Sequence, residues 1–151
     1  ELNEQIQSLL KEDPKVCLAA SSLGGFMAML LSIKYDLKVA LVNPCLYPVK
    51  FVRDNNYVGT TLKNFDTGHE FTIEESDLEY LEEQEALLPK FNLKNASVFL
   101  QAGDEVLDYT YALKFFMRGG VGGFSLKDGG SHGYDDFEEE VGKIVEFFKK
   151  D

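Results

Sequence analysis

Apolar residues along the chain fall into short runs that alternate with longer segments of helical spacing. The short runs, bounded by Pro, Gly, Asp or Asn, are typical of buried strands, and they cover residues 16–20, 38–42, 96–100 and 123–127. The helical segments cover residues 2–12, 26–35, 108–117 and 137–150, and one face of the last carries Phe137, Val141, Ile144, Val145 and Phe148. Strands that alternate with helices predict an α/β fold with a parallel sheet covered by helices on both faces.

The pattern changes between the second and third predicted strands, at about residues 45–95. Tyr47-Pro48, residues 54–56 and residues 67–68 indicate loops, and an acidic, solvated helix is predicted at 77–88. We interpret this stretch as a cap-like excursion over the carboxyl ends of the strands, where substrate pockets are commonly built. The rest of the pattern predicts a single domain over residues 1–151.

The segment Ala20-Ser21-Ser22-Leu23-Gly24-Gly25 joins the first predicted strand to a helix. A Ser-x-Gly turn at such a junction is typical of a nucleophile elbow, which projects the Ser hydroxyl above the sheet. The Leu23 N–H can then face an oxyanion, and small neighbours let strand and helix approach closely. The same hexapeptide also fits a small-residue turn in any α/β protein, so Ser22 needs catalytic partners.

Two further loops at the same edge of the predicted sheet carry Asp104 and His132. Ligands of open parallel sheets bind outside the carboxyl ends of the strands. A Ser hydroxyl becomes a good nucleophile when an imidazole takes its proton, and the imidazole needs a carboxylate to fix its tautomer. The chain order Ser22, Asp104, His132 is that of α/β-hydrolases. It predicts a catalytic triad.

Asp104 and His132 each have an alternative interpretation. Asp108 and Asp128 are rivals of Asp104, although Asp108 is better placed to begin a helix and Asp128 lies in the turn after the last strand. His132 could be a surface histidine, but Gly on both sides of its segment suits a mobile ring. His69 is interpreted as a surface residue of the excursion.

Composition and charge narrow the classes of function. The chain is 44% hydrophobic with 12 Phe and 7 Tyr, so it folds. Its formal net charge of −11 repels nucleic acid and anionic membranes, and no apolar run is long enough to cross a bilayer. Cys17 and Cys45 are too few for a disulfide framework, which favours a cytoplasmic protein.

No cofactor or metal ion is expected. The two His and the scattered carboxylates make no metal-ligand pattern. Gly24-Gly25 is not followed by the Lys-Ser/Thr of a phosphate-binding loop.

Four motifs resemble the YqiA-like family of small bacterial esterases, and the resemblance covers essentially the whole chain. They are Ser21-Ser22-Leu23-Gly24-Gly25-Phe26, Val42-Asn43-Pro44, Gly103-Asp104-Glu105-Val106-Leu107-Asp108-Tyr109 and Gly129-Gly130-Ser131-His132. The resemblance implies an α/β-hydrolase fold and a carboxylesterase acting on short acyl esters or thioesters. It also implies an acyl-enzyme formed by Ser22, with His132 as base and Asp104 as acid. The alternative function is a non-catalytic binding protein of the same fold, or an inactive fragment.

The chain departs from this family at two places. Ala20 stands where the family has Gly, a substitution small enough to keep the elbow. The N-terminal strand and the Gly-rich loop that supplies the second oxyanion donor have no counterpart, so we expect the native polypeptide to continue upstream of Glu1. Without them, Val16–Ala20 is expected to be an apolar sheet edge on which a second copy could pair to give a homo-oligomer.

Overall fold

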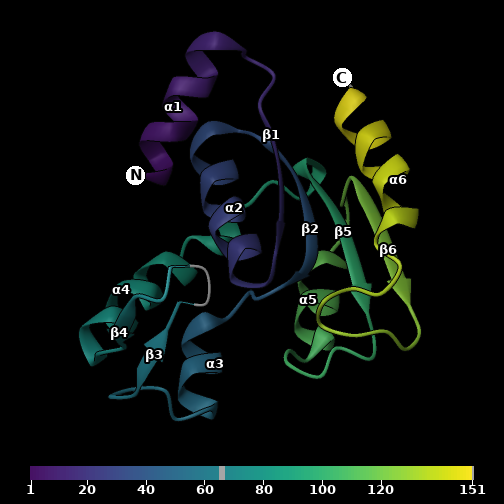
Figure 1. Cartoon of the computed structure of the whole chain (residues 1–151). Coiled ribbons are helices and arrows are strands. Elements are labelled where there is room, and N and C mark those ends of the chain that lie inside the picture. Colours follow the sequence, from purple (N-terminus) through teal and green to yellow (C-terminus); the bar gives the residue numbers. More distant parts are fainter. Residues whose placement is uncertain (65–66, 151) are drawn as a thin grey trace. The chain divides into compact units, whose positions relative to one another are not determined.

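A four-stranded parallel sheet forms the centre of the larger part of the chain (Figure 1). The computed structural model describes residues 1–64 and 67–150; Phe65 and Asp66 of the predicted excursion, and Asp151, lie outside the described residues. All four predicted strands are present, with ends shifted by at most two residues. In order across the sheet they are β1 (Cys17–Ser21), β2 (Lys38–Pro44), β5 (Ala96–Gln101) and β6 (Gly123–Lys127).

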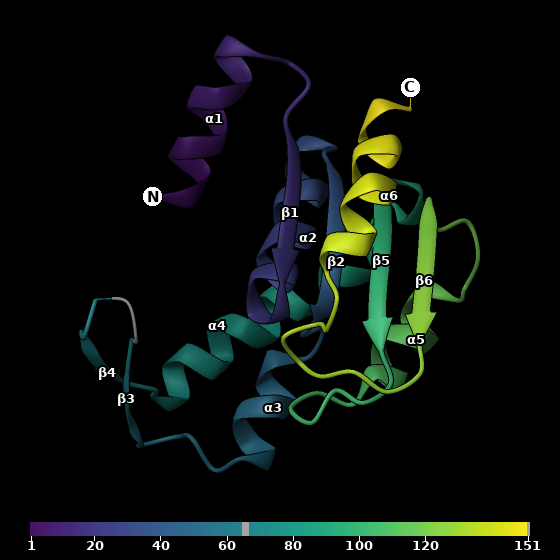
Figure 2. The ribbon, with the colours of Figure 1, turned by 45° about the vertical axis from the view of Figure 1, so that its right-hand side comes forward.

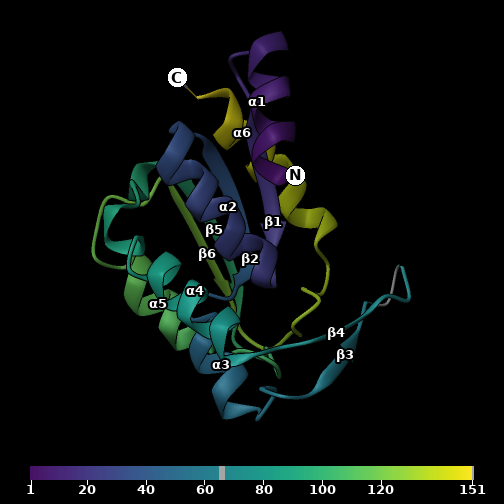
Figure 3. The same cartoon turned by 90° about the vertical axis from the view of Figure 1, so that its left-hand side faces the viewer.

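The chain folds as two compact units, residues 1–46 with 90–151, and residues 47–89. In the first unit, helices cover both faces of the sheet (Figure 3), which confirms the predicted α/β architecture. Helices α2 (Ser22–Tyr35) and α5 (Tyr109–Phe116) contact one face, and α6 (Glu138–Lys149) covers the other. Alternation along β2 and β5 explains the arrangement, because successive side chains point to opposite faces. The cluster on the α6 side consists of Ala40, Val42, Phe99, Tyr134 and Ile144.

The N-terminal helix α1 (Leu2–Glu12) is also present as predicted. Its buried Ile6 packs against Leu31 of α2 and Leu37, in a second apolar cluster. Strand β1 pairs with β2 on one side, and within residues 1–64 and 67–150 no strand pairs with its other side. Pairing of this edge with a second copy stays a prediction.

The second unit contains more regular structure than the sequence pattern indicated. A helix, α3 (Pro48–Asp54), begins where a loop was predicted, because Pro at the first helical position loses no hydrogen bond and already has a helical φ. Strands β3 (Thr61–Lys63) and β4 (Glu70–Thr72) form a short antiparallel pair. The predicted acidic helix is α4 (Glu75–Glu85), and short 3-10 turns follow at Leu88–Lys90 and, back in the first unit, at Leu93–Asn95.

Candidate functional site

The three residues predicted for the triad lie together at one edge of the sheet. In Figure 2 the four strands of the sheet point to the same edge, and the loop after β6 returns along it before α6 begins. Ser22 follows β1, Asp104 follows β5 and His132 lies in the loop after β6. His132 Nε2 lies 3.0 Å from Ser22 Oγ, and His132 Nδ1 lies 2.9 and 3.0 Å from the two carboxylate oxygens of Asp104.

The environment of Asp104 decides which nitrogen of the His132 ring carries the proton. The side chain of Asp104 is 1% exposed, and one of its oxygens accepts the backbone N–H groups of Val106 and Leu107 at 2.9 and 2.8 Å. An ionised carboxylate only accepts hydrogen bonds, so Nδ1–H of the neutral ring donates to it. Nε2 then carries no proton and accepts a hydrogen bond from the Ser22 hydroxyl. The ring is 22% exposed, so small molecules can reach it.

Ser22 lies on a sharp turn between β1 and α2. Its φ of 51° is in the left-handed region, which a non-Gly residue enters only at a cost of about 1–3 kcal/mol. The Ser22 carbonyl accepts the Cys45 N–H at 2.9 Å, which ties the turn to the end of β2. Leu23, whose side chain is exposed, lies in the first turn of α2, where backbone N–H groups have no intrahelical acceptor.

The two glycines of the turn differ in the space they need. A Cβ on Gly25 would lie 2.8 Å from Pro44 Cβ and 3.2 Å from Pro44 Cα, closer than unstrained contacts allow. A Cβ on Gly24 would lie 3.8 Å from Ala20 Cβ, an ordinary contact. Gly25 therefore allows α2 to approach the end of β2, and Ala20 fits the elbow without overlap.

We expect Gly25→Ala to lower the free energy of unfolding by about 1–3 kcal/mol, because Pro44 is a rigid neighbour. Gly24→Ala is the matched control, and its effect is expected to stay within about 1 kcal/mol, since Ala favours a helix over Gly. Urea denaturation measures both. Equal midpoints for the two variants would contradict the assignment of Gly25 as the close-approach position.

The alternatives considered for the triad lie elsewhere. The Asp108 carboxylate caps α5 and accepts the Thr110 N–H at 2.9 Å. Asp128 is exposed in the turn after β6. His69 is exposed beside β4 in the second unit. Asp104 is therefore the carboxylate that the structure brings to the His132 ring.

Two polar residues beside Ser22, Asp104 and His132 were not predicted as site residues, although Asn43 belongs to the Val42-Asn43-Pro44 motif. Asn43 and Gln101 lie near the ends of β2 and β5 and are 2% and 3% exposed. Both side chains hydrogen-bond the backbone of the loop that carries His132. The sequence feature that could have pointed to them is an amide side chain at the carboxyl end of an otherwise apolar strand.

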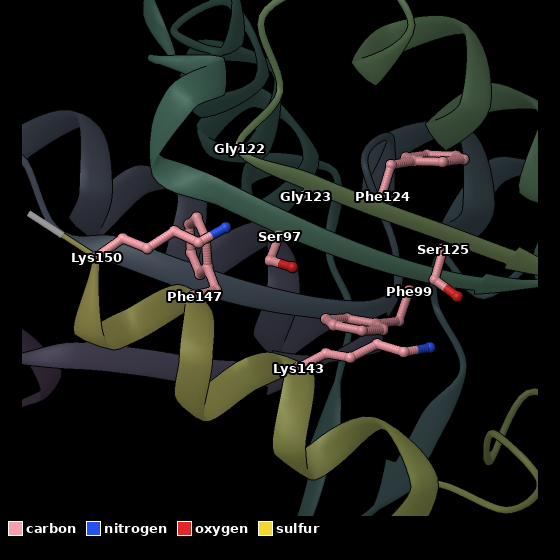
Figure 4. A pocket seen from close by; sticks show the side chains of 9 residues that line it. All are labelled: Ser97, Phe99, Gly122, Gly123, Phe124, Ser125, Lys143, Phe147 and Lys150. Atoms are coloured by element: carbon pink, nitrogen blue, oxygen red, sulfur yellow. The ribbon is translucent and has the colours of Figure 1, made fainter.

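A separate hollow of about 230 Å³ lies between α6 and strands β5 and β6 (Figure 4). None of its lining residues is a histidine, a cysteine or a carboxylate, so it contains no Ser-His or Cys-His pair. Its Lys143 ammonium donates to the buried Glu140 carboxylate at 2.7 Å. Burial disfavours ionisation of Glu140, but the neighbouring Lys143 and Lys127 ammonium groups outweigh it and lower the pKa of this carboxyl.

The described residues show neither a group of three ligands arranged to hold a metal ion nor a helix long and apolar enough to cross a membrane. Cys17 is a free thiol, and burial raises its pKa. A thiolate nucleophile at Cys17 is therefore disfavoured at neutral pH.

The sheet order, the helices on both faces and the strained turn at Ser22 define an α/β-hydrolase fold. Solved structures agree. Est1E from Butyrivibrio proteoclasticus superposes with a TM-score of 0.63 at 19% identity, over 96% of this chain and 68% of that one. Est1E with bound ferulic acid superposes with a TM-score of 0.62 at 17% identity, over 95% of this chain and 64% of that one. A monoacylglycerol lipase from Paleococcus ferrophilus superposes with a TM-score of 0.61 at 16% identity, over 96% of this chain and 72% of that one.

Identities this low establish the fold alone. The family follows from the sequence: the chain belongs to the Uncharacterised protein family (UPF0227), whose family model matches residues 1–149. This is the YqiA-like family that the four motifs resemble, so that prediction is confirmed.

Proposed function

We propose that the protein is a serine hydrolase that cleaves small acyl esters or thioesters through Ser22, His132 and Asp104. The observation that carries the proposal is the continuous hydrogen-bonded chain from the Ser22 hydroxyl through both ring nitrogens of His132 to the Asp104 carboxylate, with contacts of 3.0 and 2.9 Å. Membership of the YqiA-like family and the α/β-hydrolase fold support the same class of reaction.

The reaction begins when Ser22 Oγ attacks the acyl carbonyl carbon while its proton moves to His132 Nε2. Asp104 stabilises the imidazolium that forms. The tetrahedral intermediate collapses, its bond to the alcohol or thiol breaks, and His132 returns the proton to that leaving group. Water then attacks the acyl-enzyme with His132 again as base, which releases the carboxylic acid and restores the Ser22 hydroxyl.

The oxyanion of each tetrahedral intermediate needs hydrogen-bond donors. The Leu23 N–H is the first donor in this proposal, because the residue after the nucleophile supplies one in this fold. The N-terminal position of Leu23 in α2 also places it at the positive end of the helix dipole.

A fluorophosphonate probe tests the proposal directly, since phosphonylation of a Ser with loss of fluoride requires an activated Ser. We expect one phosphonylated residue per chain, located at Ser22 by peptide mass spectrometry, and competition by p-nitrophenyl esters of graded acyl length. Ser21→Ala is the matched control and should label at the wild-type rate. Folded wild-type protein that neither labels nor hydrolyses any ester of the panel would contradict the proposal and favour a non-catalytic binding protein.

A further inference from the structure

We propose that Asn43 and Gln101 are positioning residues that hold the His132 loop through its backbone. The inference rests on the proposed function, because it concerns the geometry of the same triad. His132 lies in the segment 128–137, which joins β6 to α6 without regular secondary structure. A ring on such a segment keeps its place only if other parts of the fold bind the segment.

The Asn43 side chain binds this loop by donation. Its Nδ2 donates to the carbonyl oxygens of Ser131 and His132 at 3.0 and 3.1 Å. Its Oδ1 accepts the backbone N–H of Gln101 at 3.0 Å. Together the three contacts use both the donor and the acceptor of the amide, so they also fix which way its NH₂ group and its oxygen point.

The Gln101 side chain binds the same loop mainly by acceptance. Its Oε1 accepts the N–H groups of Ser131 and Asp135 at 3.0 and 2.8 Å. Its Nε2 donates to the Asp135 carbonyl at 2.8 Å. Asn43 and Gln101 thus join the ends of β2 and β5 to both sides of His132.

The glycines of neighbouring loops leave room for these contacts. A Cβ on Gly130 would lie 2.1 Å from Gln101 Oε1, and Gly130 has a φ of 79°. A Cβ on Gly103 would lie 2.5 Å from the Gly130 carbonyl oxygen. The Asp104 and His132 loops can therefore approach each other only where these two residues have no side chain.

Both polar backbone groups of His132, its N–H and its carbonyl, are hydrogen-bonded. Its carbonyl accepts from Asn43, and its N–H donates to the Glu105 carboxylate at 2.9 Å. Glu105 is exposed, whereas Asn43 and Gln101 are buried, where a hydrogen bond does not compete with water. The buried pair should therefore restrict the imidazole more strongly than Glu105 does.

The test compares two isosteric changes. Asn43→Asp keeps the acceptor for Gln101 N–H but replaces the donor to two carbonyl oxygens with a carboxylate oxygen, which repels them. Gln101→Glu keeps both accepted bonds but replaces one donor, so its carboxylate oxygen repels a single carbonyl, that of Asp135. We expect kcat to fall about 10²-fold in Asn43→Asp and several-fold in Gln101→Glu, with KM nearly unchanged. Asn92→Asp, an exposed site whose side chain only accepts from Lys94 N–H, adds the same charge and should retain wild-type kcat.

A second readout does not depend on turnover. The His132 Nδ1 proton, held between the ring and Asp104, should give a low-field NMR signal in the wild type that weakens or broadens in Asn43→Asp. If the wild type gives this signal but hydrolyses no ester, loss of the signal in Asn43→Asp would still support the positioning role, while the proposed function would fail. An unchanged signal and kcat beside a lower Tm would overturn the inference and leave Asn43 a purely structural residue. If Asn43→Asp does not fold, the same two readouts on Gln101→Glu decide.

Discussion

Replacing Ser22 with alanine is expected to lower kcat for p-nitrophenyl ester hydrolysis by about 10⁴- to 10⁶-fold, because the acyl-enzyme can no longer form. The fold should remain intact. The hydroxyl makes its side-chain contact to the His132 ring, and the carbonyl that binds the Cys45 N–H belongs to the backbone and survives. Circular dichroism and urea denaturation check the fold, and initial rates check the activity.

Ser21→Ala is the control for this change. Ser21 ends β1, is exposed, and gives no side-chain hydrogen bond to the start of α2. Its substitution should leave kcat within about twofold of the wild type. Full activity in Ser22→Ala together with loss in Ser21→Ala would move the nucleophile by one position.

Asp104→Asn is expected to lower kcat by about 10⁴-fold, the cost of the wrong imidazole tautomer. The amide can still accept the Val106 and Leu107 N–H groups, so the loop should keep its shape. Its NH₂ group would donate to His132 Nδ1, which forces the ring proton onto Nε2. Nε2 then faces the Ser22 hydroxyl as a donor and cannot take its proton.

Asp108→Asn and Asp128→Asn are the matched controls for this prediction. Asn caps a helix as well as Asp does, and Asp128 is exposed. Both variants should hydrolyse esters at close to the wild-type rate. A large loss in either one, with activity kept in Asp104→Asn, would contradict the assignment of the acid.

Hydrophobic patterning predicted the four strands of the sheet because β2 and β5 are almost entirely buried and β1 and β6 are at least partly covered. It failed at β3 and β4, whose residues are mostly exposed and therefore carry no apolar signal. It also assigned the wrong face to part of α6. Val141 and Val145 are 44% and 42% exposed, whereas Glu140 is fully buried because two lysines pair with it.

The triad candidates could be chosen from the sequence because each follows a strand at the same edge of the sheet. The residues that hold the His132 loop could not be chosen in this way. Asn43 and Gln101 act through contacts between β2, β5 and a loop about 30 to 90 residues away in the sequence, with separations of 88 for Asn43–Ser131 and 30 for Gln101–Ser131. Such contacts depend on the final packing and have no local spacing rule.

The position of Asn43 directly before Pro44 protects it chemically. Asn side chains age by deamidation when the nitrogen of the next residue attacks the side-chain carbonyl and closes a succinimide ring. That nitrogen must lose a proton, and Pro44 has no backbone N–H to lose. The amide that donates to the His132 loop is thus shielded from the succinimide route to the carboxylate that would repel it.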